Sequence, residues 1–230
     1  YNGILYLNNY SGGRIDVTGR LTVNLSGDNT ITASNPGNVY SYGLGCTPSN
    51  SLNLTIAGTG SLTINATGDS SSSEGYGIYS RGYTGSVTIA DNAKVTINTK
   101  NFSKVNYGIS ALSFSQKDNS VLTLDISSTQ KESDLYGIYA DSIDLDGSGN
   151  VNLTVSAVNN DLSNNCDLYG LSAKSIALNG SGNVNVNVSA NSGEYPMGYL
   201  YGISSTSTTP VTLSGSGAKT ITMSGGRSAY

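Results

Sequence analysis

The sequence predicts an all-β protein built as a parallel β-helix, in which short strands coil into a solenoid. Apolar residues alternate with Thr, Asn and Ser over short runs, which is typical of half-buried strands. No long stretch of the chain has a helical period. A tripeptide of Tyr, Gly and Ile or Leu recurs at intervals of 34, 31, 29, 33 and 32 residues, and periods of this size indicate stacked supersecondary units.

Each repeat begins with a short strand that contains the tripeptide. A second strand follows, then in the clearest copies a Gly-Ser-Gly-Asn turn, and then a third strand with alternating aliphatic residues. In the repeat that starts at Tyr136, the second strand contains Ile143 and Leu145 and the third begins at Val151. Three short strands cannot bury their apolar face alone, so the units must stack. The anchor tyrosines of the six repeats are Tyr42, Tyr76, Tyr107, Tyr136, Tyr169 and Tyr201.

Strand alternation gives an expectation for the anchor tyrosines. Tyr136, Ile138 and Ala140 share one parity, which places the tyrosine inside the solenoid or at a corner. The glycine that follows each anchor is expected to permit either close backbone approach or an unusual backbone dihedral.

The whole chain, residues 1–230, is expected to form one solenoid domain. Residues 1–40 are less regular and are predicted to form an irregular first coil, whereas residues 41–230 contain the Tyr-Gly-Ile/Leu repeats. The chain starts at Tyr1 and ends in SGGRSAY without a recognisable polar cap. Because an uncapped edge strand invites pairing, we expect this chain to be part of a larger surface protein.

Composition narrows the classes of partner. The formal net charge is −4 and Lys and Arg do not cluster, which argues against nucleic acid. No stretch of about 18 apolar residues is present to insert into a membrane. Only 11% of residues are charged, against about 25% in ordinary domains, and this favours an extracellular location, at a cell surface or secreted.

The phrases LSGDNTIT and LTIAGTGSLTI, with the recurring YGIY and GSG segments, resemble repeats of surface-exposed β-helix proteins from anaerobic Gram-positive bacteria. Some of these relatives are carbohydrate-binding or adhesin-like, including a group that binds polygalacturonate on a pectate-lyase-like fold. The repeats predict three strands per coil and about six to seven coils, and the resemblance implies that the β-helix is right-handed.

The chain offers few groups for catalysis or metal binding. It contains no histidine, which removes Ser-His-Asp and Cys-His nucleophile arrangements. Asp144 and Asp146 alternate with apolar residues, so both are expected to point outward as a candidate Ca²⁺ site, an acid/base pair or merely a solvated strand face. Lys174 is expected beside Asp141 as an ion pair at the rim. No other cofactor is expected.

The two cysteines are predicted to be free thiols. Cys46 follows the first anchor and Cys166 precedes the fifth, which places them roughly 19 Å apart at the strand spacing. A disulfide needs Cα atoms within about 7 Å.

Two surfaces are candidates for binding. Tyr79 and Tyr139 are expected to face outward, Tyr83 to lie in a turn, and Tyr195 and Tyr199 to lie in a loop, where their rings would contact sugars. The variable loops leave the solenoid at one corner and would form a groove with the anchor strand: 67–75, 99–106, 127–135, 157–168 and 190–200. The third strands carry outward rows of Thr and Asn that suit a repetitive partner such as a polysaccharide or ice: Thr63/Asn65, Thr96/Asn98, Thr123/Asp125, Asn152/Thr154, Asn185/Asn187 and Thr220/Thr222.

Three hypotheses of function follow. The first is a non-catalytic, extracellular or cell-surface module that binds a polysaccharide, a host or neighbour surface glycan, or a protein. The second is a structural stalk of a larger surface protein. The third is a polysaccharide lyase or hydrolase, which requires at least two carboxylates and a Lys or Arg across adjacent coils.

Overall fold

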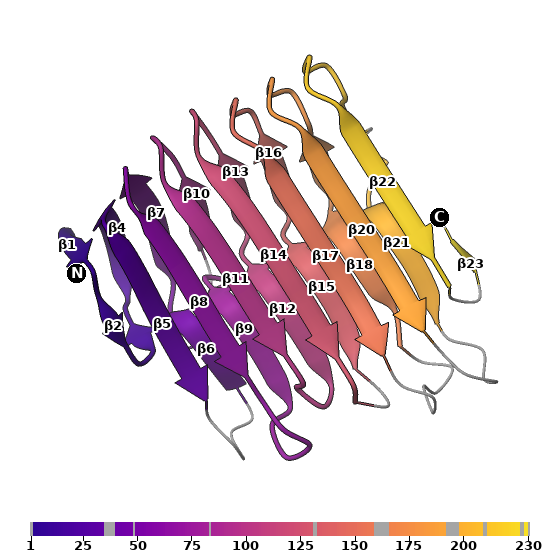
Figure 1. Cartoon of the computed structure of the whole chain (residues 1–230), viewed down its shortest axis with the longest axis horizontal. Coiled ribbons are helices and arrows are strands. Elements are labelled where there is room, and N and C mark those ends of the chain that lie inside the picture. The colour runs from indigo at the N-terminus through magenta and orange to yellow at the C-terminus, as the bar shows by residue number, and fades with distance from the viewer. Residues whose placement is uncertain are drawn as a thin grey trace.

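The computed structural model is a solenoid of parallel strands, shown in Figure 1. It describes residues 2–34, 40–47, 49–82, 84–130, 133–158, 166–191, 198–208, 211–225 and 228–229. In this part of the chain, β1–β21 form seven coils with one strand in each of three sheets, and β22 and β23 extend two of the sheets. In Figure 1 the front strands run downward while the chain advances to the right, so the solenoid is right-handed.

Successive coils contribute their strands to three sheets, called A, B and C here. Sheet A contains β1 (Asn2–Asn8), β4 (Gly19–Ser26), β7 (Leu52–Gly58), β10 (Ser86–Ile89), β13 (Ser113–Gln116), β16 (Ser142–Leu145) and β19 (Ser175–Ala177). Sheet B contains β2 (Ser11–Gly12), β5 (Asp28–Ser34), β8 (Ser61–Thr67), β11 (Lys94–Lys100), β14 (Val121–Ser128), β17 (Val151–Val158), β20 (Val184–Asn191) and β22 (Lys219–Ser224). Sheet C contains β3 (Ile15–Asp16), β6 (Tyr40–Gly45), β9 (Glu74–Tyr79), β12 (Val105–Ser110), β15 (Asp134–Tyr139), β18 (Leu168–Ala173), β21 (Tyr199–Ser205) and β23 (Ser228–Ala229).

The predicted three-strand parallel β-helix is therefore confirmed. The anchor strand of each repeat lies in sheet C, the second strand in sheet A and the third in sheet B. The first residues of the chain join the same sheets, although β2 and β3 are only two residues long. The variable loops all connect sheet B to sheet C, so they share one corner as expected.

The core consists of ladders in which equivalent residues stack from coil to coil. From β5 to β20, the inward residues of sheet B stack in register and are buried, which removes their apolar surface from water. One such ladder contains Leu62, Val95, Leu122, Val151 and Val184. Cys46 and Cys166 are both buried and free, as predicted, and they flank β6 and β18, four strand spacings apart in sheet C.

The anchor tyrosines do not point into the core, and the expectation from strand parity is wrong. A Cβ atom built on Gly137 would lie 2.9 Å from Leu153 Cδ2, so Gly137 faces the interior. Ile138, the next residue, is also fully buried. Two consecutive inward residues break the alternation, and Tyr136 therefore lies on the outer face of sheet C with Tyr139.

The glycine of the repeat fixes the spacing between sheets C and B, which gives a prediction of stability. A Cβ atom on Gly137 would also lie 2.5 Å from the carbonyl oxygen of Gly170 in the next coil. Gly137→Ala should lower the free energy of unfolding by about 1–3 kcal/mol, as overpacking does. Gly13→Ala is the matched control, because an added Cβ there meets no atom within 4 Å. Urea denaturation of both variants checks this, and equal midpoints would contradict it.

Candidate functional site

The outer face of sheet C is covered by a ladder of stacked tyrosines. The rings of Tyr76, Tyr107, Tyr136, Tyr169 and Tyr201 follow one another at centroid distances of 4.8, 4.9, 4.5 and 4.6 Å. Their planes differ by 4°, 18°, 2° and 5°, so each ring packs face to face on the next. Stacked rings present their edges, not their faces, to solvent.

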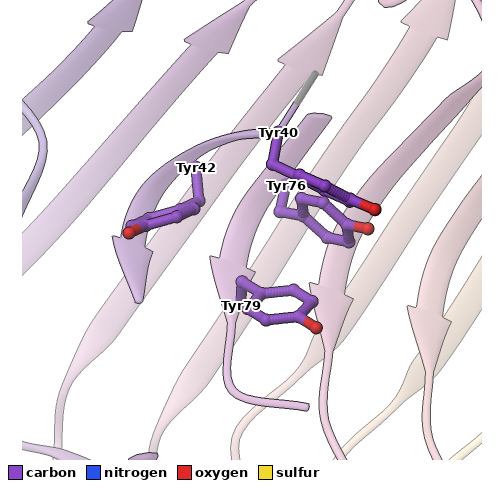
Figure 2. A pocket seen from close by; sticks show the side chains of 4 residues that line it. All are labelled: Tyr40, Tyr42, Tyr76 and Tyr79. Atoms are coloured by element: carbon purple, nitrogen blue, oxygen red, sulfur yellow. The ribbon is translucent and has the colours of Figure 1, made fainter. Parts of the chain in front are cut away.

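The predicted sugar-contact tyrosines pack against this ladder. Tyr79 lies on the outer face but is only 9% exposed, because its ring meets Tyr76 edge-on at 4.6 Å. Figure 2 shows Tyr79 with Tyr76, Tyr42 and Tyr40, and the space between the four rings has no room for a water molecule. The expectation that Tyr79 is an open contact residue is therefore wrong.

The remaining predicted tyrosines differ in their surroundings. Tyr139 is half-buried, and the guanidinium of Arg81 lies 4.2 Å from the centre of its ring. Tyr199 begins strand β21 and does not lie in a loop, so that expectation is wrong. It is 40% exposed, and its ring tilts against Tyr201 at 6.1 Å. Tyr83 and Tyr195 lie outside the described residues. Around β6 and β9, the groove expected between the loops and the anchor strand is filled by tyrosine rings.

Burial keeps the ladder tyrosines in their neutral form. Desolvation raises the pKa of Tyr76, Tyr107 and Tyr136 well above the usual range, and nearby carboxylates raise it further. The hydroxyl of Tyr76 donates to Glu74, and that of Tyr169 donates to Asp167 at 3.3 Å. The sheet C face is thus a packed aromatic surface with a carboxylate beside several of its hydroxyls.

The outer face of sheet B carries the predicted polar rows. Residues at equivalent positions pair in register, for example Thr63 with Thr96 and Asn65 with Asn98. Asn98 donates a side-chain hydrogen bond to Asn65 at 2.7 Å, and Lys100 forms an ion pair with Asp125 at 3.2 Å. Many polar groups of this face therefore already bond to one another.

The outer face of sheet A has a hollow of about 380 Å³, within the size range of small-ligand sites. Its strands here are three or four residues long, and their outward side chains are small. Two registered rows form the floor, one of serines and one that contains Ser115, Asp144 and Ala177. The serine row in the hollow consists of Ser113, Ser142 and Ser175.

Asp144 is the ionisable group on the floor of this hollow. Its side chain points outward from β16, as predicted, and is half-buried. Burial, and then the negative charge of Asp146, raise the pKa of Asp144, while Lys117 opposes this shift. Within the described ranges the Asp144 carboxylate has no hydrogen-bond or ion-pair partner, so it is available to a ligand.

Asp146 and Lys117 lie at the end of the hollow that turns toward sheet B. Both are exposed, and the amide of Asp146 donates to the carbonyl of Gln116, which places it beside Lys117 of the preceding coil. In the parts of the chain that the structure describes, no group of three or more Asp, Glu or Cys side chains is placed to hold a metal ion. The Ca²⁺ site at Asp144 and Asp146 stays a prediction, which would need further oxygen ligands from hydroxyls, backbone or water.

The other end of the hollow is bordered by a cluster of three charges. Lys174 Nζ lies 2.8 Å from Asp141 Oδ2, which confirms the predicted pair, and Arg81 Nη2 lies 2.9 Å from Asp141 Oδ1. The hydrogen bond from Lys174, with help from Arg81, lowers the pKa of Asp141. Sequence reasoning missed Arg81 because it reaches Asp141 from a turn two coils away.

Sequence reasoning also missed an exposed aromatic side chain on sheet A. Tyr6 is 71% exposed on β1 and lies beside Ile4, which pairs with Thr22 of the next coil. The alternation of ILYLN, with both leucines facing inward, was a signal that could have found it. Tyr6 lies five strands from Asp144 on the same face, roughly 24 Å at the strand spacing.

Comparisons with family models, with curated proteins and with solved structures gave no match to this chain. Among the described residues there is no helix of the length and apolar character needed to cross a membrane.

The opposite pKa shifts of Asp141 and Asp144 give a prediction about stability and pH. Asp141 is ionised more easily in the folded chain, so Asp141→Asn should lower the free energy of unfolding near neutral pH, by no more than about 1 kcal/mol for a partly exposed pair. Asp144 is ionised less easily in the folded chain, so Asp144→Asn should raise the free energy of unfolding near neutral pH.

Both differences should disappear in acid, once the two carboxyl groups are protonated in the folded and unfolded chains alike. Urea unfolding of the two variants at neutral and at acidic pH checks this. A loss of stability in Asp144→Asn as large as that in Asp141→Asn would show that Asp144 has a stabilising partner.

Proposed function

We propose that this β-helix is a non-catalytic, extracellular or cell-surface module that binds carbohydrate, and that the ligand lies in the hollow on sheet A. The observation that carries the proposal is this hollow, with its serine row and the unpaired carboxylate of Asp144. Hydroxyl groups both donate and accept hydrogen bonds, and an ionised carboxylate accepts strong ones, which together suit sugar hydroxyls.

The shape of sheet A favours an extended ligand. Equivalent residues recur at the strand spacing of about 4.8 Å, so the row that contains Ser142 offers the same contact several times along the axis. Tyr6 provides an exposed aromatic ring at the N-terminal end of the same face. A polysaccharide parallel to the solenoid axis would contact both. Composition and the resemblance to bacterial surface β-helix proteins also favour a glycan of a host or neighbouring surface.

A structural stalk is the second candidate function. The feature that favours it is the stack of core ladders, together with the tyrosine stack from β9 to β21, which stiffens the rod. A stalk needs no ligand, and its surface hollows would be incidental.

The third candidate function is that of a polysaccharide lyase or hydrolase. Asp144 lies on β16, Asp146 follows that strand, and Lys117 follows the adjacent strand β13. The charges of Asp146 and Lys117 both shift the pKa of Asp144. They form a set of two carboxylates and a lysine, the minimum that such an enzyme requires.

Affinity electrophoresis tests the binding proposal. The purified chain is run in gels that contain polygalacturonate, xylan, β-glucan or mucin glycans, with and without Ca²⁺. Retardation in one gel is expected. Ala177→Arg places a long side chain in the hollow and should abolish the retardation, whereas Thr154→Arg on sheet B is the matched control and should not.

The other outcomes separate the remaining hypotheses. Retardation that requires Ca²⁺ and is lost in Asp144→Asn would assign the ion to Asp144, with Asp125→Asn on sheet B as the control. Retardation lost in Thr154→Arg instead would move the site to sheet B. New reducing ends in the polysaccharide after incubation would support the enzyme, and no retardation in any gel would support the stalk.

A further inference from the structure

The tyrosine ladder has a regular geometry along the solenoid. Four successive pairs of rings keep centroid distances between 4.5 and 4.9 Å with nearly parallel planes. Isolated aromatic pairs in proteins prefer offset or edge-to-face arrangements over a wider range of distances. Here the coil register imposes continuous π contact along the axis, over residues about 30 positions apart in the sequence.

We propose that this ladder conducts oxidising equivalents along the solenoid, from an oxidised tyrosine at one end to a neutral one at the other. The activity is independent of the proposed carbohydrate binding. A one-electron oxidant in the solvent, such as an excited or oxidised metal complex, supplies the equivalent. The structure assigns the rest of the path to Tyr76, Tyr107, Tyr136, Tyr169 and Tyr201.

Both ends of the ladder are accessible to such an oxidant. Tyr199 is 40% exposed and its ring contacts Tyr201. Tyr40 is 43% exposed and borders the same space as Tyr76, as Figure 2 shows. An oxidant can reach the inner rings of the ladder only through these end residues or at the exposed edges of the rings themselves.

The chemistry requires an acceptor for a proton, because a tyrosine that loses an electron becomes a strong acid. Tyr76 has Glu74 as acceptor and Tyr169 has Asp167, each through a hydrogen bond from the phenol. Within the described residues, Tyr107 and Tyr136 have no carboxylate at hydrogen-bond distance. Between Tyr76 and Tyr169, the oxidised state should therefore rest on one of these two end tyrosines, and the two rings between them should only pass it on.

Electrons and protons balance in each transfer. Oxidation of Tyr169 sends one electron to the oxidant and the phenol proton to Asp167, and leaves a neutral tyrosyl radical. Tyr76 then gives one electron through Tyr107 and Tyr136 to the Tyr169 radical, and its proton passes to Glu74. The Tyr169 oxygen takes back its proton from Asp167. The net result is that the radical has moved from Tyr169 to Tyr76.

The test attaches the oxidant at one end. Ser204→Cys places a thiol on the outer face of β21, in register with the position of Tyr139, while Cys46 and Cys166 are buried and should not react. The new thiol is labelled with a ruthenium photosensitiser and illuminated with a sacrificial electron acceptor and a nitroxide radical trap. Peptide mass spectrometry then locates the trapped tyrosines, and adducts are expected at Tyr169 and at the distant Tyr76.

The double variant Tyr107→Phe/Tyr136→Phe keeps the stacked rings but removes the oxidisable phenols. Adducts at Tyr76 should fall to the level of unlabelled protein, and those at Tyr169 should persist. Tyr6→Phe/Tyr10→Phe, which removes two phenols outside the ladder, is the control and should change neither. Glu74→Gln removes the proton acceptor and should shift adducts from Tyr76 to Tyr169.

Two results would overturn the proposal. One is an unchanged yield at Tyr76 in the Tyr107→Phe/Tyr136→Phe variant, since the oxidation would then travel by another route. The other is confinement of adducts to Tyr169, Tyr199 and Tyr201 in the parent protein, since nothing would then have migrated. Thermal unfolding of each variant, followed by circular dichroism, establishes that the stacked coils persist.

Discussion

Backbone hydrogen bonding between successive coils is the constraint on which the rest of this structure depends. Each strand pairs in parallel with its counterpart one coil away, so every side chain lies directly over the equivalent side chain at about 4.8 Å. One register therefore determines the aliphatic ladders inside, the tyrosine stack outside sheet C, and the polar rows of sheets A and B. A residue that suits one coil is repeated in the next because its neighbours in the ladder have the same environment.

The repeat glycine links the core to the outer aromatic stack. At Gly137 the backbone of sheet C lies against Leu153 of sheet B, and no side chain could occupy that space. With Gly137 and Ile138 both facing inward, Tyr136 is turned to the outside. The aromatic rings then fill the surface of sheet C, which leaves no hollow between Tyr40, Tyr42, Tyr76 and Tyr79. The same packing stiffens this face and covers the ring faces that would otherwise contact sugars.

The three outer faces consequently have different chemistry, although one repeat generates all of them. From β9 to β21 the outer face of sheet C is aromatic, with carboxylates beside several of its hydroxyls. Sheet B is flat, and several of its polar groups bond to each other, as Asn65 and Asn98 do. Around Ser142 and Asp144 the strands of sheet A are short and their outward side chains are small, so a hollow remains there. This face also carries the unpaired carboxylate of Asp144, on which the proposed carbohydrate binding rests.

The sequence was enough to predict the solenoid, the strand order within each coil, the free cysteines and the outward position of Asp144, because these depend only on local alternation and on the period of the repeat. It misplaced the anchor tyrosines because parity counting assumes unbroken alternation, and the break at Gly137 arises from contact with another sheet. It missed the burial of Tyr79 and the position of Arg81 over Tyr139, since both depend on residues from other coils. The tertiary structure alone decided which face is filled and which is hollow, because side-chain volumes from several coils combine only after the coils have stacked.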